Sequence, residues 1–141
     1  MNEARIEIRW RDMDAYGHVN NAVFLNYLEE CRDALVQKAL GAISDTDNFI
    51  LVRVAIDYRN ELKLDDGAVI VRCRLAQIGR SSVTTREEIL KLDGTVSAES
   101  ESVIVPRVPE TGRSRRLRDD EREALEAELT ADDAGSVRQT T

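Results

Sequence analysis

The segment from Asn20 to about Leu40 constrains the fold most strongly, because its apolar residues cover too much of a helix to face water. One stripe at helical spacing contains Phe24, Leu28, Cys31 and Leu35, and a second beside it contains Val23, Tyr27, Ala34 and Val36. Gly41 is a suitable end for this helix. So wide an apolar surface predicts a helix that the rest of the chain covers on most sides.

Alternation of apolar and polar residues predicts strands before and after this helix. Ile6, Ile8 and Trp10 alternate with charged residues, which indicates a first strand with one buried face. Four further strands are predicted over residues 50–59, 69–75, 83–92 and 95–105. The turns between them are Asp65-Asp66-Gly67, Gly79-Arg80-Ser81 and Asp93-Gly94. The order predicts an α+β fold in which an antiparallel sheet of about five strands wraps round one long central helix.

Length and the prolines set the expected domain organisation. The 141 residues fit one domain with a substantial core. Pro106 and Pro109 close it, so we expect a domain over residues 1–108 and a C-terminal extension over residues 109–141. In the extension, Leu117, Leu125 and Leu129 predict a short helix, and the residues from Thr130 onward form a polar tail.

Charge and cysteine content limit the partners and the compartment. The net charge is -7, which argues against a nucleic-acid interface because that needs a basic face. No apolar run approaches twenty residues and no leader is evident, so we expect no membrane contact and a cytoplasmic location. Cys31 and Cys73 lack metal-ligand spacing and are interpreted as small buried hydrophobes in a reducing compartment.

The functional side chains are concentrated between the first strand and the helix. Asp12 and Asp14 lie there, with the only histidine of the chain, His18, and two amides. A strand that leads into a helix leaves unpaired backbone N–H groups at the helix start, where the dipole also favours negative charge. Asp14 and His18 therefore lie beside a potential oxyanion site. A turn-forming role for Asp14 and a packing role for His18 are the structural alternatives.

This stretch resembles the motif of the hot-dog-fold acyl-CoA thioesterases of the 4-hydroxybenzoyl-CoA thioesterase type. The matching residues are Asp12, Asp14, Gly17, His18, Val19, Asn20 and Asn21, followed on the helix by Phe24, Tyr27, Glu29, Glu30 and Arg32. The resemblance implies a hot-dog fold and hydrolysis of acyl-CoA without a metal or bound cofactor. It also implies a homodimer or homotetramer in which two sheets join edge to edge and each active site lies between subunits.

The resemblance also assigns roles to individual residues. Asp14 would be the base or nucleophile, and His18 would polarise the water or protonate the departing thiolate. Asp12 would brace the loop. The substrate-binding residues would be Tyr16, Gly17, Asn20 and Asn21, with the backbone N–H at or near Asn21 on the thioester oxygen, and Arg80 and Ser82, which would contact the nucleotide phosphates. Glu30 is a further candidate only through its place on the central helix.

Two other functions stay open at this point. Plant acyl-carrier-protein thioesterases have an Asp-x-Asn-x-His order, which Asp14 and His18 match, although Tyr16 replaces the asparagine. Hydrolysis of acyl-carrier-protein thioesters is therefore an alternative. A non-catalytic acyl-CoA binding module is the other. The sequence does not determine the acyl group, the carrier, the precise role of Asp14 or the size of the oligomer.

Overall fold

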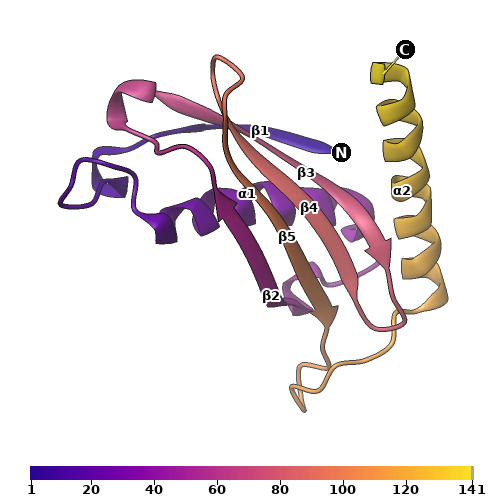
Figure 1. Cartoon of the computed structure of the whole chain (residues 1–141). Helices are drawn as coiled ribbons and strands as arrows, with labels where there is room; N and C mark the ends of the chain where they lie inside the picture. Colours follow the sequence, from indigo (N-terminus) through magenta and orange to yellow (C-terminus); the bar gives the residue numbers. More distant parts are fainter. Residues whose placement is uncertain (141) are drawn as a thin grey trace.

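A five-stranded antiparallel sheet curves round one long helix in the computed structural model, which describes the backbone of residues 1–140 and the side chains of residues 1–132 (Figure 1). The elements are β1 (Asn2–Glu7), α1 (Asn21–Leu40), β2 (Phe49–Tyr58), β3 (Ala68–Ile78), β4 (Val83–Lys91), β5 (Val96–Pro106) and α2 (Asp119–Thr140). Three short 3-10 turns span Trp10–Asp12, Thr46–Asn48 and Leu64–Asp66. The strand order is β1-β3-β4-β5-β2. The predicted fold class is confirmed.

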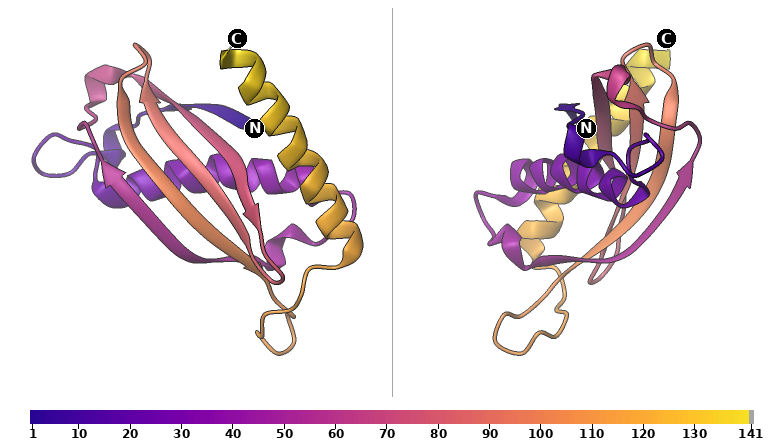
Figure 2. Two further views of the ribbon diagram at one scale, coloured as in Figure 1. Left: turned by 45° about the vertical axis from the view of Figure 1, so that its right-hand side comes forward. Right: turned by 90° about the vertical axis from the view of Figure 1, so that its left-hand side faces the viewer.

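The core lies between α1 and the inner face of the sheet, as the turned views of Figure 2 show. Leu28, Cys31 and Leu35 of α1 are fully buried, and they meet alternate residues of β3 such as Val69 and Val71. The helix ends at Leu40, immediately before Gly41, as predicted. The apolar residues at helical spacing in α1 and the alternating apolar residues of the strands therefore form a single core.

The first strand ends earlier than the alternation predicts. Its last residue is Glu7, and Ile6 and Ile8 are buried, but Trp10 lies in a 3-10 turn and is 80% exposed. The expectation that Trp10 faces the core is wrong. The chain turns here because the backbone N–H of Arg9 donates to the carboxylate of Asp12, at 2.9 Å, and this bond ends the extended run.

The C-terminal helix packs against the rest of the fold. Leu117 and Leu125 are buried in the same core cluster as α1, and α2 lies beside β3 and α1 (Figure 1). The helix continues through Thr140, so it includes the backbone of residues for which the sequence predicts a polar tail. The domain boundary at residues 108 and 109 stays a prediction. Over the described residues, no helix combines the length and the apolar character needed to cross a membrane.

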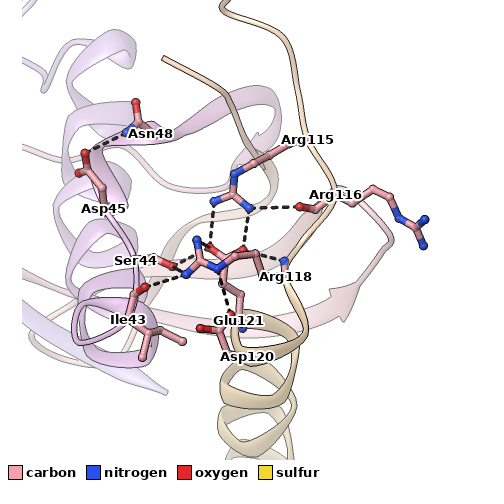
Figure 3. A network of polar contacts seen from close by, with 9 residues as sticks. All are labelled: Ile43, Ser44, Asp45, Asn48, Arg115, Arg116, Arg118, Asp120 and Glu121. Atoms are coloured by element: carbon pink, nitrogen blue, oxygen red, sulfur yellow. Dashed lines mark hydrogen bonds and ion pairs between the residues drawn. The ribbon is translucent and has the colours of Figure 1, made fainter. Parts of the chain in front are cut away.

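A buried carboxylate ties the start of α2 to the loop after α1 (Figure 3). Glu121 accepts hydrogen bonds from the Arg115 guanidinium, at 2.7 and 3.0 Å, and from the Ser44 hydroxyl, at 2.6 Å. It also accepts the backbone N–H of Arg118, at 2.8 Å, which caps the helix. Burial alone raises the pKa of Glu121, but these bonds outweigh it and lower the pKa to about 2.

A second buried carboxylate lies at the centre of the core. Glu87 of β4 forms an ion pair with Arg32 of α1, with 3.3 Å between Nη1 and Oε1, and both side chains are almost completely buried. The hydroxyls of Thr85, Ser100 and Ser102 also donate to Glu87, at 3.0, 3.0 and 3.3 Å. The charge on Glu87 is thus neutralised by Arg32 and its oxygens are saturated by hydroxyls.

We expect the Glu121 network to make stability depend on acid pH. The folded pKa of Glu121 lies below its ordinary value of about 4.5, so its contribution is complete above about pH 5 and is lost as pH falls toward 2. Chemical denaturation should show that the free energy of unfolding of the parent exceeds that of Glu121→Gln by about 3 kcal/mol at pH 7. That gap should close by about pH 2. A gap that stays constant from pH 7 to pH 2 would contradict the role of Glu121.

The Arg32–Glu87 pair predicts strong coupling between two substitutions. Arg32→Met leaves Glu87 buried without its counter-ion and should reduce the free energy of unfolding by about 3–5 kcal/mol. Adding Glu87→Leu should recover much of that loss, because the isolated charge is removed.

Urea denaturation of the single and double variants measures this coupling. The control is Arg53→Met, which breaks the exposed Arg53–Glu101 pair of 3.4 Å and should cost at most about 1 kcal/mol. Additive losses from Arg32→Met and Glu87→Leu would show that the two side chains are not coupled.

Candidate active site

Backbone bonds hold the loop between β1 and α1 to itself and to the connection between β2 and β3. The N–H of Val19 donates to the carbonyl of Leu62, at 2.7 Å, and the N–H of Asn20 donates to the carbonyl of Asp12, at 2.9 Å. Met13 and Val19 also form an isolated antiparallel bridge. The residues from Asp14 to His18 therefore project as a short hairpin beside the start of α1.

Asp12 braces this loop from inside, as the resemblance implies. Its buried carboxylate accepts the Arg9 N–H, two bonds from the Arg9 guanidinium at 3.0 and 3.2 Å, and the Tyr27 hydroxyl at 2.7 Å. Burial raises the pKa of Asp12, but these bonds and the charge of Arg9 outweigh it, so the net pKa is lowered. Burial and the neighbouring Asp12 raise the pKa of Tyr27. Asp12 is thus an anchoring anion whose oxygens are fully used.

Asp14 forms the hairpin and leaves one oxygen available. Its Oδ1 accepts the backbone N–H groups of Tyr16, at 2.8 Å, and of His18, at 3.1 Å. Gly17 completes the turn with a φ of +81°, a conformation that favours glycine. The turn-forming role is therefore real. Within the described part of the chain, Oδ2 has no hydrogen-bond donor, so the same carboxylate can still act on a ligand.

His18 is paired with a residue that the sequence analysis missed. Its Nε2 lies 3.0 Å from Oε2 of Glu61, and its side chain is 40% exposed, so it does not pack in the core. His18 and Asp14 meet through the His18 backbone: its N–H donates to Oδ1 of Asp14, at 3.1 Å, and its carbonyl accepts the N–H of Asp14, at 2.7 Å. No sequence pattern points to Glu61, because it follows β2 and reaches the loop only through the packing of the neighbouring Leu62, which is fully buried.

The start of α1 presents a free backbone donor next to this hairpin. The side chain of Asn20 caps the helix by accepting the N–H of Ala22, at 2.9 Å, and its carbonyl accepts the N–H of Val23, at 2.8 Å. Asn21 is the first helical residue, so its N–H has no acceptor within the helix. The hydroxyl of Tyr58 donates to the Asn21 carbonyl, at 3.0 Å, and so ties the first helical residue to β2. The geometry leaves the Asn21 N–H free for an oxyanion.

The other residues that the sequence analysis proposed for the site lie at different distances from the start of α1. Tyr16 is at the tip of the hairpin and is 85% exposed. Arg80 and Ser82 lie in the turn between β3 and β4, at the other end of the sheet, because β3 begins beside the end of β1 and is eleven residues long. At about 3.3 Å per residue, this turn is roughly 30 Å from the β1 end. One chain therefore does not bring Arg80 and Asp14 together. Glu30 is exposed on α1, more than two turns beyond Asn21.

Two surface hollows lined by described residues are prominent, and the lining of neither includes Asp14. A groove of about 650 Å³ runs between α1 and β2 and is lined by Glu29, Arg32, Asp33, Ala34, Val36, Gln37, Thr46, Asp47, Phe49, Ile50, Leu51 and Ile104. A larger hollow of about 880 Å³ lies over charged side chains of the sheet, such as Arg72 and Glu88. Among the residues described, no group of three or more His, Cys, Asp or Glu side chains has the geometry of a metal site.

Comparison with known proteins identifies the family of the chain and proteins of the same fold. Residues 8–125 match the family model of the thioesterase-like superfamily. The chain is similar to the long-chain acyl-CoA thioesterase FadM of Escherichia coli (strain K12), with 30% identity over 128 residues, which cover 88% of this chain and 96% of that protein.

Two solved structures extend the comparison. A thioesterase from Thermus thermophilus, complexed with coenzyme A and zinc, is 31% identical, with a TM-score of 0.81 over 92% of this chain and 94% of that one. A DHNA-CoA thioesterase from Staphylococcus aureus also gives a TM-score of 0.81, over 95% of this chain and 94% of that one. It is 17% identical, so that likeness concerns the fold alone.

Proposed function

The chain belongs to the thioesterase-like superfamily, and from that premise we propose that it hydrolyses acyl-CoA thioesters to the free acid and coenzyme A. The resemblance of the loop motif to acyl-CoA thioesterases is thereby confirmed. One observation carries the proposal for this chain. Among the described residues, Oδ2 of Asp14 and the N–H of Asn21 have no partner; Asp14 lies in the loop that leads into α1 and that the buried Asp12 holds in place, and Asn21 is the first residue of α1.

This pair of groups supplies the two requirements of thioester attack. The N–H of Asn21 and the positive end of the α1 dipole stabilise the carbonyl oxygen as it gains negative charge, an effect typically worth about 100-fold or more in rate. Asp14 either bonds to the carbonyl carbon or takes a proton from an attacking water. His18 gives a proton to the departing sulfur. The scheme uses only groups of the protein.

We propose a homodimer as the smallest active assembly, formed along β2. This strand is at the edge of the sheet and exposes Leu51, Val52 and Tyr58, at 41%, 48% and 43%. A long apolar edge with unpaired backbone groups is a natural place for a second strand. Two copies related by a two-fold axis would pair their β2 strands antiparallel.

The same arrangement explains how Arg80 can serve a site that it does not reach within its own chain. The turn that carries Arg80 lies at the Phe49 end of the sheet, whereas Asp14 lies at the Tyr58 end. Antiparallel pairing along β2 places the Phe49 end of one sheet beside the Tyr58 end of the other. The partner's Arg80 then lies at the same end as Asp14, where it can meet the nucleotide phosphates.

Two features bear on the rival functions and on the compartment. The exposed Tyr16 side chain makes no hydrogen bond within the described residues, so the third member of the Asp-x-Asn-x-His arrangement has no counterpart. We therefore favour coenzyme A over acyl-carrier protein as the carrier. Cys31 and Cys73 are free thiols in the core, which supports a reducing, cytoplasmic location. An assay of thiol release separates the two remaining functions: a thioesterase releases free thiol from acyl-CoA, and a module that only binds acyl-CoA does not.

We expect Asp14→Asn to lose at least about 100-fold in kcat, because an asparagine amide can still form the hairpin through its oxygen but is neither a base nor a nucleophile. The measurement is release of free thiol from short, long and aromatic acyl-CoAs, with circular dichroism and sedimentation as controls for fold and assembly. Hydrolysis by the variant within a few-fold of the parent would remove Asp14 from the mechanism. Saturable binding without thiol release by the parent would favour the binding module.

For Arg80→Ala we expect a higher KM for acyl-CoA and an almost unchanged kcat, because the phosphates are remote from the reacting carbonyl. A truncated acyl-pantetheine, which lacks the nucleotide, should be hydrolysed equally by both proteins. The increase in KM should shrink as salt rises. Since Arg80 lies roughly 30 Å from the Asp14 of its own chain, this result would also support a site shared between subunits. Equal losses on both substrates would instead assign Arg80 to the fold.

A further inference from the structure

We propose that Glu61 is a positioning residue that fixes the ring of His18 so that Nδ1 is the atom that exchanges a proton with the substrate. The inference rests on the proposed thioester hydrolysis and adds a residue to it. The observation that supports it is the contact of His18 Nε2 with Glu61 Oε2, at 3.0 Å, which joins two segments that lie far apart in the sequence.

The pairing is anchored by the backbone on both sides. The residue after His18, Val19, is buried and donates its N–H to the carbonyl of Leu62, the residue after Glu61, at 2.7 Å. Leu62 is itself completely buried. The contact is therefore built into the fold, in contrast to most exposed ion pairs, in which two long side chains meet from independent positions.

A carboxylate at Nε2 determines which ring nitrogen carries the proton. An ionised carboxylate only accepts hydrogen bonds, so a ring that turns its Nε2–H onto Glu61 gains a charge-assisted bond, and the 3.0 Å contact places Nε2 within reach of that bond. In the neutral ring, Nδ1 then holds the lone pair. This nitrogen is on the side of the ring nearer its own backbone, whose N–H donates to Oδ1 of Asp14. A ring held at Nε2 by Glu61 therefore leaves Nδ1 as the nitrogen with the available lone pair.

The neighbouring charges are compatible with this role. Lys63 contacts the other oxygen of Glu61, with 3.3 Å between Nζ and Oε1, so Oε2 stays directed at His18. Asp14 is the acid on the backbone side of the ring, and Asp12 is already saturated by Arg9 and Tyr27. Glu61 and Lys63 are both more than half exposed, so substituting Glu61 does not disturb the core.

The proton transfers balance when Asp14 and His18 share them. Asp14 takes a proton from water as the water oxygen bonds to the carbonyl carbon. The C–S bond then breaks, and the thiolate sulfur receives the Nδ1 proton of the doubly protonated His18 ring. The ring is left neutral with its proton on Nε2, which is the form that Glu61 holds. Asp14 returns its proton to the ring through solvent, and the products are the acid and the free thiol.

The first test reads the ring directly and does not depend on activity. Because His18 is the only histidine, histidine labelled with ¹⁵N gives one pair of ring signals. At about pH 9, where a histidine ring is neutral, we expect the proton on Nε2 in the parent. Glu61→Gln, whose amide can also donate, should lose this preference, and Glu61→Asp should keep part of it. A proton on Nδ1 in the parent, or the same tautomer ratio in the parent and Glu61→Gln, would overturn the proposal.

The second test is kinetic. We expect Glu61→Gln to lower kcat for acyl-CoA by about tenfold with KM within about twofold, and Glu61→Asp to recover part of the loss. The pH profile of kcat should change only for the Glu61 variants. The matched control is Glu110→Gln, an exposed acid in the loop before α2, which should behave as the parent. Unchanged kcat in Glu61→Gln, or a loss confined to KM, would overturn the positioning role.

These experiments distinguish failure of the proposed hydrolysis from failure of the proposed role of Glu61. A parent protein that releases no thiol from any acyl-CoA refutes the proposed hydrolysis, whatever the ring spectrum shows. A parent that hydrolyses acyl-CoA and has the proton on Nδ1 refutes the role of Glu61 alone.

Discussion

The burial of the Arg32 charge constrains how α1 packs against the sheet, because that charge must face Glu87. A helix enclosed by a sheet must bury almost every side chain on its inner faces, and Arg32 carries a charge into that interior. A lone charge there would cost several kcal/mol, so Glu87 must face it, and three hydroxyls must complete its bonds. With both charges present, this requirement favours the rotation of α1 that turns Arg32 toward β4 and β5.

The position of α1 in turn determines the position of the site. Tyr27 is on the buried side of the helix, and its hydroxyl reaches back to Asp12 in the preceding loop. Tyr58 of β2 contacts the helix start through the Asn21 carbonyl and packs edge-on against Phe24, with 5.1 Å between ring centroids. The helix thus holds the loop with Asp14, and β2 in turn holds the helix start. Such rigid support suits a group that must meet a developing charge.

The functional groups are divided between the two ends of the sheet. Asp14, His18 and the free N–H of Asn21 are at the end where β1 stops and β2 finishes, and Arg80 is at the opposite end. The apolar edge of β2 offers a reason for this division, since pairing of two such edges would combine opposite ends of two chains. In that arrangement an incomplete site within one chain becomes complete between two.

The sequence by itself determined the elements and the loop motif, whereas the tertiary structure decided which distant residues meet. The spacing of Leu28, Cys31 and Leu35 predicts α1, and Gly67 and Gly94 mark turns at positive φ, because these are properties of neighbours along the chain. The exposure of Trp10 was mispredicted, since alternation does not reveal that Asp12 ends the strand. The contact of Glu61 with His18 and the separation of Arg80 from Asp14 had no local signal. Both follow from strand register and from the burial of Leu62, which arise only when the sheet closes round the helix.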